Sequence, residues 1–267
     1  AMTPMTGMIR STISDMRQLR QIMMMVVRMN NQILERYFAD HGALLRVNGS
    51  AAEKYEQYME LVLDYNQHVN LTAITDRDDF AVKNIIDSLD LFGDERYQKA
   101  KTVIDVGTGA GLPGIPLALA SPDKEFVLMD SLAKRVKIVE EIARKLDLAN
   151  VTAIHGRAED LAREPQYRES FDLCVSRAVS RLNVLSEYCL PFVRKGGWFV
   201  SYKGKNYSDE LTDAEAALKK LGGRLEAVEE RSMKEFGLSH VLLYMFKYKS
   251  TPKEYPRRAG VPQKKPL

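Results

Sequence analysis

Three glycines at alternating positions give this chain a segment whose backbone can approach a ligand closely. Gly107, Gly109 and Gly111 follow residues 102–106, an apolar, β-branched run that predicts a buried parallel strand. Residues 112–120 then predict a helix, with a proline in its first turn where a missing N–H costs nothing. Because amides at a helix N-terminus attract anionic groups, the segment predicts a nucleotide site.

The spacing of the glycines discriminates between nucleotide cofactors. A dinucleotide fingerprint has its third glycine three positions after the second, but Leu112 stands there and the pattern is G-x-G-x-G. Asp105 precedes the first glycine by two residues, and Asp130 ends a second predicted strand, where a carboxylate can accept ribose hydroxyls. Together these features indicate an S-adenosylmethionine (SAM) site. The alternative is that the glycines only shape a structural turn.

Residues that follow the other strands are further candidates, because ligands of open α/β sheets lie beyond the carboxyl ends of the strands. Ala158 and Glu159 follow the third predicted strand, where such folds hold adenine, although Glu159 could simply be an acid in the first turn of a helix. Arg177 and Lys203 follow the fourth and fifth strands. Their cations can hold the SAM carboxylate or a substrate phosphate, with surface ion pairs as the alternative.

The residues after the fourth strand narrow the type of methyl acceptor. Enzymes that methylate exocyclic amines place an Asn/Asp-Pro-Pro-aromatic motif there, and this chain has Ser176-Arg177-Ala178. Carbon methylation of pyrimidines needs a nucleophilic cysteine on a loop, whereas Cys174 and Cys189 fall within a predicted strand and helix. A ring nitrogen such as guanine N7 has a lone pair and no proton to lose. It needs positioning rather than a general base, which suits this sequence.

The elements that must position these residues alternate regularly after the glycine-rich turn. Further strands are predicted at residues 125–130, 151–155, 171–176, 197–202, 225–232 and 240–247, with long helices at 132–146 and 208–221. The short connection between the last two strands predicts an antiparallel hairpin on the sheet edge. The fold class is therefore α/β: a Rossmann-like, mostly parallel seven-stranded sheet of the class I SAM-dependent methyltransferase type.

Four parts are expected along the chain. Residues 1–30 form a poorly defined N-terminal extension, and residues 31–95 form a helical cap, because apolar residues recur there at three- and four-residue spacing. Residues 96–249 form the methyltransferase domain. Residues 250–267, here called the tail, are basic and contain four prolines, so no regular structure is expected in them.

Composition excludes several classes of protein. The chain has 267 residues, of which 45% are apolar, and this is enough for a sizeable core. The net charge of +3 is too small to indicate a nucleic-acid partner by itself. Two cysteines form neither a disulfide framework nor a C-x-x-C metal pair, which favours a reducing cytosol and no metal. The early apolar run at residues 22–27 is too short to cross a membrane, so no membrane partner is expected.

Several separated motifs resemble the ribosomal RNA small-subunit methyltransferase G family, also called glucose-inhibited division protein B, over residues 33–267. The motifs are Tyr65-Asn66 with Asn70-Leu71-Thr72, IDVGTGAGLPGIPLA from Ile104, MDSLAKRVKIVE from Met129, GRAED from Gly156, SRAVSRLNVL from Ser176, Lys203-Gly204 and TPKEYPRR from Thr251. The family transfers a methyl group from SAM to N7 of one guanine in the decoding region of bacterial 16S rRNA. The resemblance therefore implies a cytoplasmic bacterial enzyme that acts on 16S rRNA or a small-subunit ribosomal particle.

The resemblance also implies roles for individual residues. Gly107, Leu112, Ala158, Glu159 and Arg177 would bind SAM, and Lys203 would lie near the RNA. We expect Arg177, Lys203 and Asn70 to position the substrate. The chain departs from the family at Asn84, where many members have a histidine, and at Tyr65, where a tryptophan is common.

Three other functions remain open from the sequence. The chain could be a SAM-dependent methyltransferase of a small molecule or of another RNA, a nicotinamide-dependent oxidoreductase, or a non-catalytic RNA-binding module. In the favoured interpretation the cap and the basic tail grip RNA phosphates, so RNA binding weakens as salt is added. We expect the protein to act as a monomer.

Overall fold

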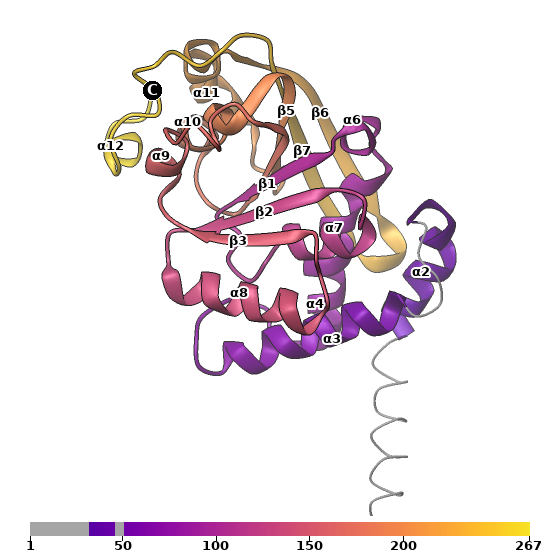
Figure 1. The fold of residues 1–267 in the computed structure, drawn as a ribbon. Helices are drawn as coiled ribbons and strands as arrows, with labels where there is room; N and C mark the ends of the chain where they lie inside the picture. Colours follow the sequence, from indigo (N-terminus) through magenta and orange to yellow (C-terminus); the bar gives the residue numbers. More distant parts are fainter. Residues whose placement is uncertain (1–31, 46–50) are drawn as a thin grey trace, which may run out of the picture.

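A seven-stranded sheet forms the centre of the computed structural model, which describes residues 32–45 and 51–267 (Figure 1). The strands, in their order across the sheet, are β3 (Val151–His155), β2 (Glu125–Asp130), β1 (Thr102–Val106), β4 (Phe171–Arg177), β5 (Val193–Lys203), β7 (Leu238–Lys247) and β6 (Gly223–Met233). Strands β1 to β5 pair in parallel, and β7 runs antiparallel to both β5 and β6. The predicted fold class and edge hairpin are confirmed.

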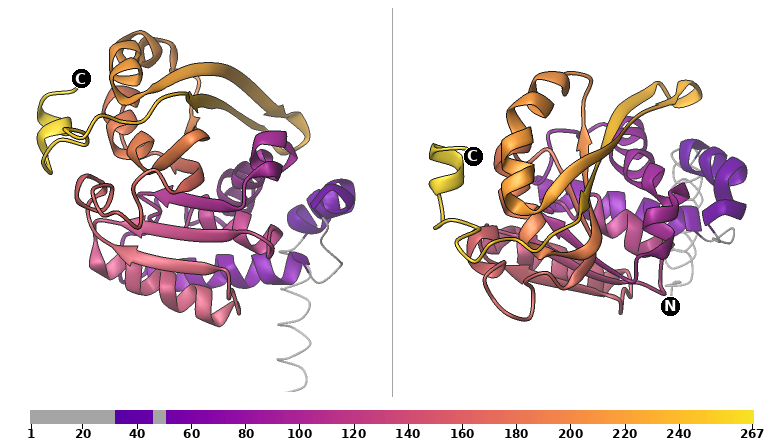
Figure 2. Two further views of the ribbon diagram at one scale, coloured as in Figure 1. Left: turned by 45° about the horizontal axis from the view of Figure 1, so that its top comes forward. Right: turned by 90° about the horizontal axis from the view of Figure 1, so that it is seen from above.

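Helices cover both faces of the sheet (Figure 2). Alternate residues of β1 face the two layers. Val103 packs in the cluster that includes α7 (Gly114–Ala120) and α8 (Ala133–Lys145). Ile104 packs in the other cluster, formed with α9 (Ala158–Leu161), α10 (Leu182–Cys189) and α11 (Ser208–Leu221). Successive side chains of a strand point to opposite faces, so a strand buried on both sides needs a continuous apolar run.

The helical cap packs on the side of the sheet that carries α7 and α8. Its first helices are α2 (Gln32–Leu45) and α3 (Ala51–Asn66). Tyr55 and Tyr58 of α3 are buried and donate hydrogen bonds to the carbonyl oxygens of Pro116 and Ala110, at 2.9 and 3.0 Å. Because Ala110 belongs to the glycine-rich turn, α3 supports that turn directly.

Replacing Tyr58 with phenylalanine removes only the donor to Ala110. We expect the free energy of unfolding to fall by about 1 kcal/mol, because a buried carbonyl loses its partner. Urea denaturation measures this change. The matched control is Tyr65→Phe, whose hydroxyl meets Lys145 at an exposed position and whose loss should change the free energy by less than about 0.5 kcal/mol. Equal values for the two variants would contradict the expected support of the turn by α3.

The predicted helix at residues 78–92 is an unbroken helical run with mixed geometry. It comprises α4 (Arg77–Phe80), the π-helical η1 (Ala81–Ile86), α5 (Asp87–Leu89) and the 3-10 helix η2 (Asp90–Gly93), and α6 (Glu95–Lys99) follows. π-Helical turns occur often at functional sites, where the wider turn redirects side chains. Here η1 carries Asn84, the residue at which the chain departs from the expected family pattern.

Three sequence predictions of local structure are wrong. Strand β5 begins at Val193 rather than at position 197, because Val193 already pairs with Phe171 across an irregularity in the ladder. Helix α7 begins at Gly114 rather than at position 112, because the amides of Gly111 and Leu112 donate to Thr108 and the turn continues through them. The tail contains a short helix, α12 (Val261–Lys264), in which Pro262 occupies the first turn that proline tolerates.

The predicted N-terminal extension at residues 1–30 lies outside the described residues. Within the described residues, no helix has the length and apolar character needed to span a membrane.

Candidate active site

The glycine-rich turn after β1 adopts backbone angles that favour glycine. Gly107, Gly109 and Gly111 have φ values of +76°, +58° and +93°. A Cβ at Gly107 would lie 2.5 Å from Val179, and one at Gly111 would lie 2.5 Å from Ile115. At Gly109 a Cβ would meet only the carbonyl oxygen of Gly107, at 4.0 Å, so this is the glycine that a ligand can approach.

Asp105 holds this turn together from beneath. It is 0% exposed, and its Oδ2 accepts hydrogen bonds from the Thr108 hydroxyl at 2.7 Å and the Gly114 amide at 2.9 Å. Burial raises the pKa of Asp105 to about 7, although both hydrogen bonds oppose the shift. Asp105 therefore shapes the turn from within the core.

Asp130, at the end of β2, links the turn to the neighbouring strand. Its Oδ2 accepts from the Gly109 amide at 3.0 Å, and its Oδ1 accepts from the Leu132 amide at 2.9 Å. The side chain is nearly buried. The structure thus brings together the first two predicted acids and the turn, with Asp130 beside Gly109.

Ala158 and Glu159 begin helix α9 and are both buried. The carboxylate of Glu159 lies near Arg157 and also accepts a hydrogen bond from the backbone amide of Gly260, at 2.8 Å. This contact with the tail was not predicted. No local sequence pattern could have found it, because the two residues are 101 positions apart.

Arg177 ends β4 and points into the cap. Its guanidinium donates to the Lys83 carbonyl at 2.7 Å, to Asn84 Oδ1 at 2.8 Å and to Asp87 Oδ2 at 3.0 Å. The expected family histidine is thus replaced by an amide that accepts from Arg177. The predicted cation at this strand end is neutralised by a carboxylate, in a pair that is largely buried rather than on the surface.

Asp87 also belongs to a buried charge cluster between the cap and the edge hairpin. His240 of β7 lies between two carboxylates, with Nδ1 2.5 Å from Asp87 and Nε2 3.0 Å from Asp90. Arg231 of β6 lies 3.8 Å from Asp90. Burial alone would lower the pKa of His240, but the two carboxylates outweigh it and raise the pKa to about 9. His240 is therefore protonated at neutral pH.

This cluster predicts a pH-dependent stability. Because the folded-state pKa of His240 is about 9 and the unfolded value is about 6.5, its stabilisation is complete below about pH 6.5 and is lost as pH rises through 9. The loss amounts to about 3 kcal/mol at most. Unfolding free energies measured between about pH 6 and pH 10 should fall more steeply for the wild type than for His240→Gln. Parallel curves would contradict the assignment.

Lys203 and Asn70 differ in how much of each remains available to a substrate. The Lys203 ammonium donates to the Ser180 carbonyl at 2.8 Å and pairs with Glu210 at 2.7 Å, so it links β5 to the loop after β4. Asn70 is exposed, and its backbone carbonyl oxygen accepts a hydrogen bond from the Arg135 guanidinium. The residues after Asn70 are held by Asn66, whose Oδ1 accepts from the backbone amides of Leu71 and Thr72.

The family of the chain is established by sequence comparison. A sequence profile described as GidB, rRNA small subunit methyltransferase G, matches residues 51–238 and so spans the cap from α3 onward, the glycine-rich turn and most of the sheet. The chain belongs to this family. The match agrees with the resemblance noted in the sequence and runs against a nicotinamide-dependent oxidoreductase.

Curated members of the methyltransferase G family resemble the chain over most of its length. A ribosomal RNA small subunit methyltransferase G of Clostridium novyi is 45% identical over 223 residues, which cover 84% of this chain and 92% of the relative. Proteins of the same name are 45% identical in Lachnoclostridium phytofermentans, covering 83% and 91%, and 43% identical in Alkaliphilus oremlandii, covering 85% and 95%.

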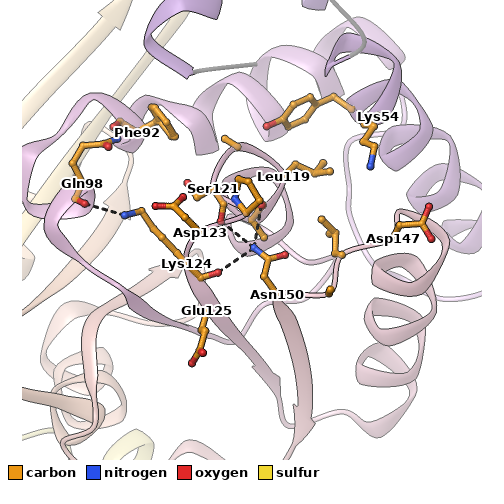
Figure 3. A pocket seen from close by; sticks show the side chains of 16 residues that line it. Lys54, Phe92, Gln98, Leu119, Ser121, Asp123, Lys124, Glu125, Asp147 and Asn150 are labelled. Carbon is orange, nitrogen blue, oxygen red and sulfur yellow. Dashed lines mark hydrogen bonds between the residues drawn. The ribbon is translucent and has the colours of Figure 1, made fainter. Parts of the chain in front are cut away.

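A cavity of about 980 Å³ (Figure 3) lies by the start of β2, at the opposite end of the strand from the predicted site residue Asp130. It is lined by the start of β2, the ends of α7 and α8, and part of the cap. Asn150 donates there to the carbonyls of Ala118, Ser121 and Lys124, and Lys124 donates to Gln98 (Figure 3). None of the predicted site residues lines this cavity. Parallel sheets bind ligands beyond the carboxyl ends of their strands, and the cavity lies by the start of β2.

Proposed function

We propose that the chain methylates N7 of a guanine in bacterial 16S rRNA with SAM as the methyl donor. The observation that carries the proposal is the contact between the glycine-rich turn and Asp130 at the carboxyl ends of β1 and β2, with Glu159 following the neighbouring strand β3. Membership of the methyltransferase G family supports the choice of ribosomal RNA as the substrate.

The side chains at this edge fit SAM. The space above Gly109 is open, and Asp130 and Glu159 supply carboxylates that can accept from hydroxyl and amine groups. Among the described residues, the large apolar side chains that stand out as exposed are Leu132, at 52%, and Val179, at 39%. Both follow strands that end at this edge, so apolar surface is available to the cofactor. Sequence reasoning overlooked them.

Each residue then has a distinct part in the proposed reaction. Gly107, Gly109, Gly111, Leu112, Asp130, Ala158 and Glu159 would hold SAM, while Asp105 shapes the turn. Arg177 and Lys203 act as positioning residues, because each already pairs with a carboxylate of its own fold. Asn70 is exposed and would face the RNA.

The chemistry asks for alignment rather than proton transfer. SAM supplies a methyl group bonded to a positively charged sulfur. Guanine N7 brings a lone pair and carries no proton, so the chain needs no general base for this acceptor. Its task is to orient the two partners and to exclude water, and alignment of that kind can account for a large share of a rate enhancement.

The test is transfer of labelled methyl from SAM to small-subunit RNA from cells that lack an enzyme of this family. Naked 16S rRNA and small-subunit particles are assayed in parallel, followed by reduction and aniline cleavage, which cuts at 7-methylguanosine. We expect one cut in 16S rRNA, lost in Asp105→Ala. SAM binding without labelled RNA would overturn the proposed acceptor and indicate a small molecule or another RNA, and RNA binding without SAM binding would indicate a non-catalytic module.

A further inference from the structure

The tail is docked on the methyltransferase domain along most of its length. Two arginines that follow α9 hold its first part: Arg163 donates to the carbonyls of Glu254 and Pro256, and Arg168 donates to those of Thr251, Pro252 and Tyr255. Figure 1 shows the tail, in yellow, returning to α9 and α10. The tail is therefore part of the folded domain.

A buried ion pair fixes the middle of the tail. Glu187 of α10 is 0% exposed, and it accepts four hydrogen bonds from Arg257, one from the backbone amide and three from the guanidinium. A buried carboxylate needs such a partner, since an uncompensated buried charge is strongly destabilising. Of the tail's basic residues, Arg257 is thus committed to the fold and is unavailable to RNA phosphates.

Beyond this anchor, the tail reaches two loops of the proposed cofactor site. The Gly260 amide donates to Glu159, which follows β3, at 2.8 Å. Gln263 Oε1 accepts from the hydroxyl of Ser180, which follows β4, at 3.3 Å. Strands β3 and β4 lie on either side of β2 and β1, whose ends carry Asp130 and the glycine-rich turn. The tail thus extends across the carboxyl ends of β3, β2, β1 and β4, from one side of the proposed site to the other.

We propose that residues 258–267 form an outer wall of the SAM site, with the Gly260 amide as the group that positions Glu159. The inference rests on the proposed function, because it assigns Glu159 to the adenosyl part of SAM. A buried carboxylate that accepts from a fixed backbone amide loses rotational freedom before the cofactor arrives, and such preorganisation favours binding. The tail then affects the affinity for SAM rather than the affinity for RNA.

Gly260 allows a matched pair of full-length variants. Its φ is +83°, and a Cβ there would meet nothing within 4 Å. Gly260→Asn keeps the amide and suits a left-handed backbone, so its dissociation constant for SAM should stay within about threefold of the wild type. Gly260→Pro has no N–H and cannot adopt this φ, and it should weaken SAM binding at least about tenfold. Both constants are measured by calorimetry without RNA.

Further variants separate this role from a role in gripping RNA. The double variant Glu187→Gln with Arg257→Gln removes the buried charge together with its partner, and it should weaken SAM binding as Gly260→Pro does. Lys253→Ala removes an exposed cation of the tail outside residues 258–267 and should leave SAM binding unchanged. In Gly260→Pro and in the double variant of Glu187 and Arg257, we expect the KM for SAM to rise while kcat at saturating SAM is retained. Circular dichroism checks that each variant is folded.

The outcomes distinguish the two proposals. If the wild type itself binds no SAM, the proposed function fails. If the wild type binds SAM and Gly260→Pro binds it equally well, only the wall formed by the tail is overturned. If Gly260→Pro binds SAM normally but binds RNA more weakly, the wall formed by the tail is also overturned. The tail would then contribute to RNA binding.

Discussion

Gly111→Ala should reduce the affinity for SAM by about a hundredfold or more, the larger of the two main effects expected for this protein. A Cβ at this position would lie 2.5 Å from Ile115, and the φ of +93° is strained for any residue with a side chain. Left-handed strain costs about 1–2 kcal/mol and overpacking about 1–3 kcal/mol. The turn can relieve the backbone strain and the overlap with Ile115 only by moving. Its amides then leave the positions that the cofactor needs. Calorimetric titration with SAM measures the loss.

The matched control for this change is Gly196→Ala. Gly196 has a similar φ of +83°. It lies near the start of β5, whereas the glycine-rich turn follows the end of β1. A Cβ at Gly196 would approach only the end of the Arg194 side chain, at 3.3 Å. Its strain should lower stability while leaving the affinity for SAM within about twofold. If the two alanine variants bind SAM equally, the glycine-rich turn is not the cofactor site.

Arg177→Ala should lower kcat/KM for methylation of small-subunit RNA by about a hundredfold. The guanidinium holds three acceptors of the cap, and its removal leaves Lys83, Asn84 and Asp87 without that donor. Because η1 is thereby released from the end of β4, the RNA is no longer aligned with the methyl group. The dissociation constant for SAM, measured separately, should change much less than kcat/KM, which distinguishes misalignment from loss of the cofactor.

Arg181→Ala is the control, because Arg181 lies in the same loop and also pairs with a carboxylate. Its pair with Asp213 is exposed, at 59% and 52%, so its loss should change kcat/KM by less than about threefold. A wild-type kcat/KM in Arg177→Ala, with the protein folded, would show that the cap does not need this anchor.

The two cations predicted to face the substrate are linked to the fold by different routes. Arg177 joins β4 to the cap, and Lys203 joins β5 to α11 through Glu210. His240 adds a second connection, from the edge hairpin to Asp87. Asp87 thus fixes the cap to the sheet near the carboxyl ends of β4 and β5, and a substrate that moves the cap must disturb its pairs with Arg177 and His240.

Local patterns were sufficient to predict the elements and the turn. Strand β3 and helix α11 have the bounds that the sequence predicts, because apolar periodicity and turn residues are properties of neighbouring positions. The turn was recognisable for a similar reason. Gly107, Gly109 and Gly111 all have positive φ, and glycine is the residue that adopts such angles most readily, so the residue types themselves indicate the turn. The mostly parallel sheet and its antiparallel edge hairpin followed from the alternation of strands and helices and from the short last connection.

The partners of the charged residues could not be predicted in this way. Arg177 meets Asp87 across 90 positions, and Glu159 meets Gly260 across 101. The type of a charged residue does not indicate which distant element will pack against it. An arginine or a lysine, such as Arg177 or Lys203, can pair equally with a phosphate or with a carboxylate. Packing of the cap, the tail and α11 against the sheet selects the partner, so that Arg177 and Lys203 each pair with a carboxylate of the fold.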